Sequence, residues 1–347
     1  MHNRRGKVMH LMRAWVKNAF GYSTPFVRVL PSDRCNLACR YCFQHDERSA
    51  DMTLGGFEAC LAHGKRLGAG LISFLGGEPL LWPHLPEAIR RCTERRVFSD
   101  VTTNGTLLDA ETTFALAEAG LDFLNISVDV CKANRVTAKN SLLKPQRLEP
   151  LLAARHEHGL KVRVNSVLYK DNSEEIKELI EWTHGHRIPI SIGFIVPDFG
   201  RPDDDAAEVY FGAGDRELLD GIIEHIIDKK TQGYQIIDTR EYFRNFPRFL
   251  RGEQFWECNY QRRFGWINVT PNGRIRSCTK KMDELEDRFV DLTPRRVREL
   301  RADFRAMIRE CNVHCYSNCA YNAYHFFHHM PAVLLKYALG RYRPRWS

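Results

Sequence analysis

The chain has 347 residues, of which 44% are hydrophobic and 27% are charged, and its formal net charge is +8. These proportions are typical of a globular protein, and the length predicts two domains or one large α/β domain with an appendage. No stretch approaches the roughly 20 apolar residues of a membrane-spanning helix, and the first residues lack a secretory signal, so we expect a cytoplasmic protein.

The first twenty-five residues form a basic amphipathic segment. Within it, Lys7 to Ala19 can form a helix whose apolar face carries Val8, Leu11, Met12, Trp15 and Ala19. We expect this helix to dock on its own domain; the alternative, for it and for the basic, aromatic tail at 326–347, is peripheral contact with an anionic membrane. The positive charge is not gathered in one block and no nucleic-acid motif accompanies it, so a nucleic-acid partner is not favoured.

Six short apolar runs alternate with helical stretches between residues 26 and 196. We predict strands at 26–31, 70–75, 98–103, 121–129, 161–169 and 190–196, and helices at 53–67, 85–95, 110–118, 150–158 and 173–184. Alternation at this spacing predicts βαβ units and a parallel sheet. Six strands suit an α/β fold with a partial (βα)6 barrel better than a closed eight-stranded barrel.

Polar motifs follow the predicted strands. The stretch SDRCNLACRYCFQ (32–44) follows the first strand, GGEP (76–79) the second and TTNG (102–105) the third, while SVD (127–129) ends the fourth and Asn165 lies within the fifth. Because the chemistry of such folds gathers at the carboxyl ends of the strands, we expect these motifs to share one rim.

The first of these motifs places Cys35, Cys39 and Cys42 within eight residues. Structural zinc sites usually have four protein ligands, and cubane iron–sulfur clusters are normally held by four cysteines. Three clustered thiols therefore suggest a metal centre with one open position. A zinc loop or a chance cluster is the alternative.

The C-x3-C-x2-C spacing, in a loop after the first strand, resembles the signature of the radical SAM superfamily. The resemblance implies that Cys35, Cys39 and Cys42 each bind one iron of a [4Fe–4S] cluster, whose fourth iron is chelated by S-adenosylmethionine. It also implies a set of residues around that cofactor, comprising Tyr41 and Phe43 near the adenine, Gly76, Gly77, Glu78 and Pro79 at the methionine ammonium, and Asn104, Ser127, Asp129 and Asn165 at the carboxylate and ribose. Taken singly, GGEP is also compatible with a tight turn, and Ser127 and Asp129 with strand-end capping.

The resemblance implies reductive cleavage of S-adenosylmethionine to a 5′-deoxyadenosyl radical, which abstracts hydrogen from an unactivated C–H bond. It also implies an external one-electron reductant of the flavodoxin or ferredoxin type. We expect oxidation, epimerisation or cross-linking in the maturation of a peptide or small-molecule natural product. The alternatives are a sugar or aminoglycoside-type dehydrogenase or epimerase and, less favoured, an RNA-modifying enzyme or a non-catalytic metal-binding protein.

The region after about residue 235 has a different character. INVTPNGRIRSC predicts a β-hairpin, and five of the eleven cysteines lie here, at Cys258, Cys278, Cys311, Cys315 and Cys319. Their C-x14-G-x4-C opening resembles the SPASM domain, but five cysteines in place of seven indicate the truncated twitch version with one auxiliary [4Fe–4S] cluster. We therefore expect a radical SAM core at 26–235 and the auxiliary cluster domain at 236–325.

Three further cysteines lie in the core. Cys131 follows SVD and is a candidate catalytic thiol, although a free cysteine is more often a small buried hydrophobic residue. Cys60 and Cys92 fall on predicted helices, where we expect them in the hydrophobic core.

Overall fold

The computed structural model describes residues 4–19, 23–42, 50–195, 207–253, 255, 266–276, 278, 284–309, 316–318 and 321. Within them, nine strands form one sheet in the order β6-β5-β4-β3-β2-β1-β7-β8-β9. The strands are β1 (Phe26–Val29), β2 (Leu71–Phe74), β3 (Phe98–Thr103), β4 (Phe123–Ser127), β5 (Lys161–Leu168), β6 (Ile190–Phe194), β7 (Trp266–Val269), β8 (Arg274–Arg276) and β9 (Glu284–Arg288).

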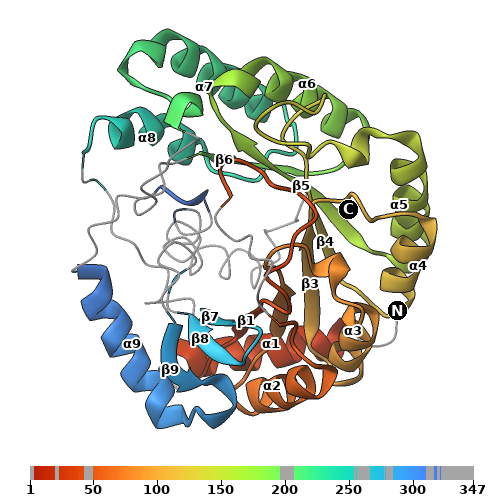
Figure 1. Cartoon of the computed structure of the whole chain (residues 1–347). Coiled ribbons are helices and arrows are strands. Elements are labelled where there is room, and N and C mark those ends of the chain that lie inside the picture. The colour runs from red at the N-terminus through yellow and green to blue at the C-terminus, as the bar shows by residue number, and fades with distance from the viewer. Residues whose placement is uncertain are drawn as a thin grey trace, which may run out of the picture.

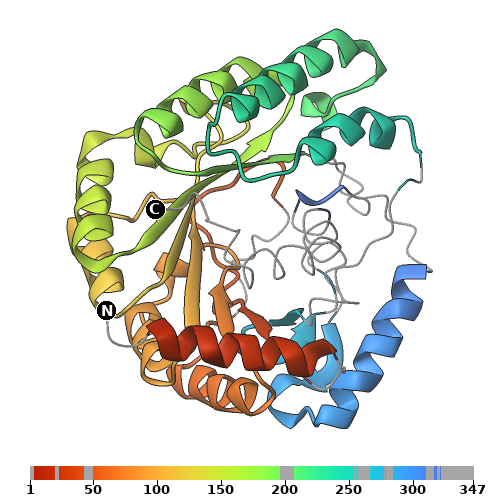
Figure 2. The ribbon, with the colours of Figure 1, turned by 180° about the vertical axis from the view of Figure 1, so that it is seen from behind.

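Strands β1 to β6 are mutually parallel and lie in chain order, as the sequence predicts. The helices are α1 (Arg4–Ala19), α2 (Leu54–Arg66), α3 (Leu85–Glu94), α4 (Ala110–Glu118), α5 (Pro145–His158), α6 (Ser173–Gly185), α7 (Arg216–Thr231), α8 (Arg240–Leu250) and α9 (Pro294–Arg309). Figures 1 and 2 show α2 to α7 along the outside of the arc of strands. The α/β fold with an open, mostly parallel sheet is confirmed.

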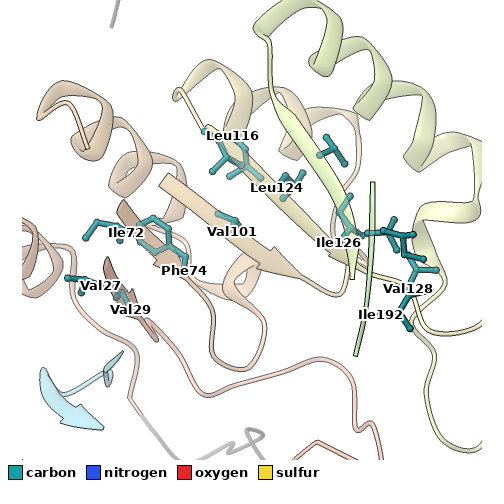
Figure 3. Close-up of a cluster of buried hydrophobic side chains, with 14 of the residues drawn as sticks. Val27, Val29, Ile72, Phe74, Val101, Leu116, Leu124, Ile126, Val128 and Ile192 are labelled. Atoms are coloured by element: carbon teal, nitrogen blue, oxygen red, sulfur yellow. The ribbon is translucent and has the colours of Figure 1, made fainter. Parts of the chain in front are cut away.

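The face of the sheet toward these helices is hydrophobic. Alternate residues of each strand point to it, and Figure 3 shows them packed together, among them Val27, Ile72, Val101, Leu124 and Ile192, each at most 1% exposed. Removing a side chain of this size from water contributes about 1.5–3 kcal/mol. Cys60 and Cys92 belong to the same core, as predicted.

The predicted hairpin is present as β7 and β8, which pair antiparallel around a turn in which Gly273 has φ +80°. Its place in the sheet is not evident from the sequence. Strand β7 lies parallel to β1, opposite β2, so that Trp266 stacks on Phe26 with ring centroids 5.1 Å apart. The hairpin thus extends the sheet at the strand that leads into the cysteine loop.

Helix α1 docks on its own domain, as expected, along the amino ends of the strands (Figure 2). The Lys7 ammonium lies 2.6 Å from Asp122 just before β4, and the His10 ring contacts the carbonyl of Ala69 just before β2. The predicted contact face is wrong at Val8, which is 42% exposed, whereas Lys7 is 3% exposed. Lys7 is buried because it pairs with Asp122, whereas Leu11 of the predicted face does pack, against Gly70. Within the described part of the chain, no helix is long and apolar enough to cross a bilayer.

Replacing Lys7 by methionine should therefore lower the free energy of unfolding by about 2 kcal/mol, because Asp122 loses a charged partner. Urea denaturation would measure it. The matched control is Arg13→Met, which changes an exposed side chain of the same helix and should cost less than about 0.5 kcal/mol. Equal effects of the two changes would contradict the proposed docking contact.

Candidate active site

The cysteine loop leaves the carboxyl end of β1 and is held by the backbone of the GGEP motif. The amide of Gly77 donates to the carbonyl of Ser32, and the amide of Glu78 donates to that of Arg34. A Cβ on Gly77 would lie 2.0 Å from the Arg34 oxygen, and Gly76 has φ +137°. Both positions thus require glycine, because a side chain would separate the two loops.

Glu78 is 1% exposed and joins the ends of β2 and β3. Its carboxylate accepts hydrogen bonds from the Thr103 hydroxyl at 2.6 Å, the Asn104 amide at 2.7 Å and the Leu80 amide at 3.0 Å. Burial raises the pKa of Glu78, although these donors act against the shift. Pro79 begins a short 3-10 helix (Pro79–Leu81) that Glu78 caps.

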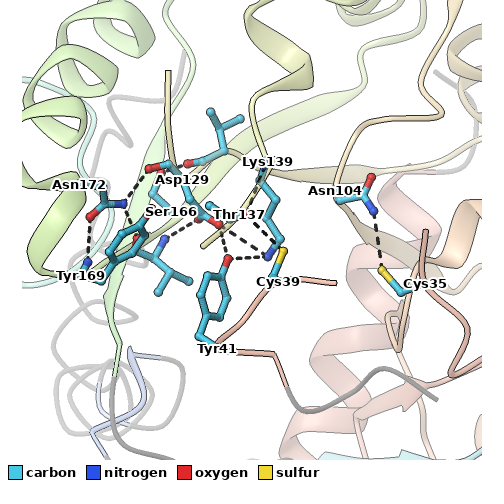
Figure 4. A network of polar contacts seen from close by, with 12 residues as sticks. Cys35, Cys39, Tyr41, Asn104, Asp129, Thr137, Lys139, Ser166, Tyr169 and Asn172 are labelled. Carbon is cyan, nitrogen blue, oxygen red and sulfur yellow. Dashed lines mark hydrogen bonds and ion pairs between the residues drawn. The ribbon is translucent and has the colours of Figure 1, made fainter. Parts of the chain in front are cut away.

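Asn104 reaches from the end of β3 to the cysteine loop. Its Nδ2 donates to Asn36 Oδ1 at 2.8 Å and lies 3.9 Å from Cys35 Sγ (Figure 4). Burial raises the pKa of the Cys35 thiol, and the negative charge of Glu78 adds to this shift. Burial and this nearby negative charge therefore both favour the protonated thiol.

Asp129 is fully buried after the end of β4, on the other side of the cysteine loop. Its Oδ1 accepts from the Val167 amide at 2.8 Å, and its Oδ2 accepts from the Tyr41 hydroxyl. The Lys139 ammonium lies 3.7 Å from the same Oδ2 and donates to the Tyr41 oxygen at 2.9 Å (Figure 4). Burial and the Asp129 charge raise the pKa of Tyr41 well above its usual value, so the phenol stays protonated and can donate.

The sequence did not single out Lys139, Thr137 or Asn172. Thr137 Oγ1 lies 3.2 Å from Cys39 Sγ, and Asn172 Nδ2 donates to the Asp129 carbonyl at 2.7 Å. Lys139 and Thr137 lie in the segment 130–140 that follows β4, and this segment has no recognisable motif. One signal could have drawn attention to this segment: it is polar and directly follows the SVD motif at the end of a strand.

Ser127 and Asn165 are brought together, because they are paired neighbours on β4 and β5. They continue a polar row on the face of the sheet opposite the hydrophobic core. In this row Asn125 donates to Asp100 at 2.7 Å, and burial raises the pKa of Asp100 although Arg163 lowers it. Parallel sheets are usually hydrophobic on both faces. A polar second face therefore indicates that this side of the sheet lines a binding site and is not packed against further helices.

Cys131 lies apart from these residues. Its amide donates to Glu175 of α6 at 2.9 Å, and burial together with Glu178 raises the pKa of its thiol to about 12. Phe43, Cys258, Cys311, Cys315 and Cys319 lie outside the described residues, whereas Cys278 follows β8.

Two of the three thiols of the loop contact different partners, Cys39 at Thr137 and Cys35 near Asn104. Among the described residues, no three His, Cys, Asp or Glu side chains are arranged as a metal site.

Comparison with known proteins identifies the family. The model of the radical SAM superfamily matches residues 29–211, which include the cysteine loop, GGEP, Asn104, Ser127 and Asp129. The chain belongs to the radical SAM superfamily. Radical SAM proteins are enzymes, and membership implies a [4Fe–4S] cluster and S-adenosylmethionine as cofactors. The donor set fits, because three thiols on one loop leave a cubane one iron that lacks a protein ligand.

Two curated relatives differ in how much of the chain they match. A GTP 3′,8-cyclase of Chlorobaculum tepidum is 33% identical over 180 residues, which cover 49% of this chain and 53% of the relative. A PqqA peptide cyclase of Granulibacter bethesdensis is 27% identical over 269 residues, which cover 71% of this chain and 65% of the relative. The chain therefore spans about half to two thirds of the length of these relatives.

Solved structures share the fold. Streptococcus suis SuiB bound to its precursor peptide SuiA aligns with a TM-score of 0.59 and 20% identity over 81% of this chain and 66% of SuiB. The enzyme anSMEcpe with bound AdoMet aligns with a TM-score of 0.62 and 15% identity over 83% of this chain and 86% of anSMEcpe. The shared fold extends beyond the residues that the family model matches.

Glu78→Gln should destabilise the metal-free protein by about 1–3 kcal/mol, because an amide NH2 would face donors that now meet a carboxylate. Urea denaturation of the apoprotein measures this without any cofactor. Glu94→Gln, at an exposed residue of α3, is the control and should change the free energy of unfolding by less than about 0.5 kcal/mol. If Glu78→Gln were as stable as the control, Glu78 would not hold the site together.

Proposed function

We propose that Cys35, Cys39 and Cys42 bind the [4Fe–4S] cluster and that the enzyme matures a peptide by abstracting hydrogen from an unactivated C–H bond. When bound, the cluster and S-adenosylmethionine supply a reductively generated carbon radical. The observation that carries the proposal is the position of the three-cysteine loop, at the carboxyl end of β1 between Glu78 and Asp129, in a radical SAM chain.

Residues of this chain would hold S-adenosylmethionine at that rim. The backbone at Gly76 and Gly77 packs directly against the cysteine loop, and we assign this backbone, with Glu78 and Pro79, to the methionine ammonium. Asn104, Ser127 and Asn165 carry polar groups suited to its carboxylate and ribose. Asp129 and Tyr41 already bond to each other, so we assign them to shaping the adenine and ribose side, with Phe43 beside them.

The extent of the relatives' matches supports a peptide substrate. The relative named as a PqqA peptide cyclase matches 71% of this chain, whereas the match to the GTP 3′,8-cyclase of Chlorobaculum tepidum covers 49%. The match to the peptide cyclase is long enough to include residues of this chain outside the radical SAM core, where a substrate-binding region would lie. Oxidation, epimerisation and cross-linking remain the candidate outcomes, and a small-molecule substrate such as a sugar is the second candidate.

An auxiliary [4Fe–4S] cluster is the second part of the proposal. We assign it to Cys258, Cys278, Cys311, Cys315 and Cys319. The observed hairpin supports this assignment, because Cys278 follows β8 and β7 pairs with β1, which leads to the first cysteine set. The fifth cysteine would be free or displaced by substrate. An external flavodoxin or ferredoxin-type reductant would supply the electron.

Anaerobically reconstituted protein with S-adenosylmethionine and dithionite should form 5′-deoxyadenosine, measured by liquid chromatography. Cys39→Ala should abolish it, because the cluster loses one of three protein ligands. Cys131→Ser is the matched control and should retain the product, since Cys131 lies against α6. No 5′-deoxyadenosine from the wild type would refute the proposed reaction.

Iron analysis tests the two cysteine sets separately. Wild-type protein should hold about eight iron atoms, and the triple variant Cys35→Ala, Cys39→Ala, Cys42→Ala should hold about four, because one cubane of four irons remains. Cys278→Ala in the wild-type background should lose iron only from the second cluster. If the triple variant held no iron, there would be no independent auxiliary cluster.

A further inference from the structure

Lys139 places a largely buried positive charge beside the cysteine loop. Its side chain is 17% exposed, whereas Arg34 and Arg40 on the loop itself are 43% and 34% exposed and pair with Asp51 and Glu208. Electrostatic interactions are stronger where water is excluded. We therefore expect the charge of Lys139 to affect the loop more than the better exposed charges of Arg34 and Arg40 do.

Two contacts connect Lys139 to the loop (Figure 4). The ammonium donates to the Tyr41 oxygen at 2.9 Å and lies 5.0 Å from the centre of the Tyr41 ring, and Tyr41 precedes Cys42 in the chain. The Lys139 amide donates to Thr137 Oγ1 at 3.3 Å, the same oxygen that lies 3.2 Å from Cys39 Sγ. Lys139 therefore touches the loop through Tyr41 and, through Thr137, reaches one of the proposed ligands.

The partner of this cation is Asp129, whose two oxygens are both in use. Oδ1 accepts from the Val167 amide, and Oδ2 faces Tyr41 and Lys139. Asp129 is 0% exposed, so without Lys139 its carboxylate would be a buried negative charge next to the thiols. Lys139 offsets that charge and leaves the pair nearly neutral.

We propose that Lys139 is a positioning residue that raises the reduction potential of the cluster bound by Cys35, Cys39 and Cys42. Reduction adds one electron, supplied by the external reductant, to a group that already carries three thiolates. A positive charge nearby favours the reduced form, and an unbalanced Asp129 carboxylate disfavours it. The inference rests on the proposed cluster site and adds to it the residue that tunes it.

The test is a redox titration of the reconstituted protein without S-adenosylmethionine, followed by electron paramagnetic resonance. All variants are made in protein that also carries Cys278→Ala, so that the proposed auxiliary cluster contributes less to the spectrum. Lys139→Met should lower the equilibrium constant of one-electron reduction about tenfold, which is a potential 59 mV more negative. Lys139→Arg keeps the charge and should stay near the parent, as should Lys132→Met, an exposed lysine of the same segment. A parent-like potential in Lys139→Met would overturn the inference.

A second pair of variants covers the case in which Lys139→Met does not hold a cluster. Asp129→Asn alone should raise the potential, because the cation is then unbalanced. The double change Asp129→Asn with Lys139→Met removes both charges and should return the potential to near the parent. No difference among these variants would overturn the inference, whereas a parent that binds no cluster at Cys35, Cys39 and Cys42 would refute the proposed function as well.

Discussion

A buried carboxylate must be satisfied by donors, and this requirement determines how the cysteine loop is held. The described part of the loop has no regular secondary structure, so it cannot fix its own thiols. Glu78 joins β2 to the start of the next rim loop through Thr103 and Asn104, and Asp129 joins Tyr41 to β5. Each carboxylate lies immediately after or close to the end of a rigid strand, so the loop takes its position from the sheet on both sides.

The two faces of the sheet have different roles. One is packed against helices by residues such as Val101 and Leu124, and the other carries Asp100, Asn125 and Asn165. A polar row inside a sheet does not serve stability, because desolvation opposes the burial of such groups. A polar interior is suited to a polar substrate, which agrees with the proposed peptide substrate, whose backbone amides need partners.

The sequence predicted the strands and helices of the core well, because hydrophobic periodicity is a local signal. It also predicted that the motifs share one rim, since parallel strands end at the same edge. It could not predict the Lys139–Tyr41 contact or the burial of Lys7, because each depends on a partner far along the chain. Lys139 is 98 residues from Tyr41, and Lys7 is 115 residues from Asp122. Helix α8 was missed although its buried aromatic residues, Tyr242, Phe243, Phe246 and Phe249, have helical spacing.

The described parts of the C-terminal region contact both edges of the six parallel strands. At β1 the contact is the hairpin, where the amide of Leu30 donates to Val269 at 2.8 Å. At the other edge Asn318 donates to Ser191 of β6 at 3.2 Å, and Tyr316 stacks on Tyr242 of α8 with centroids 4.9 Å apart. An open sheet alone has two free edges, and pairing or covering both restricts their movement. The region that carries the second cysteine set therefore also contacts both edges of the strands that carry the first set.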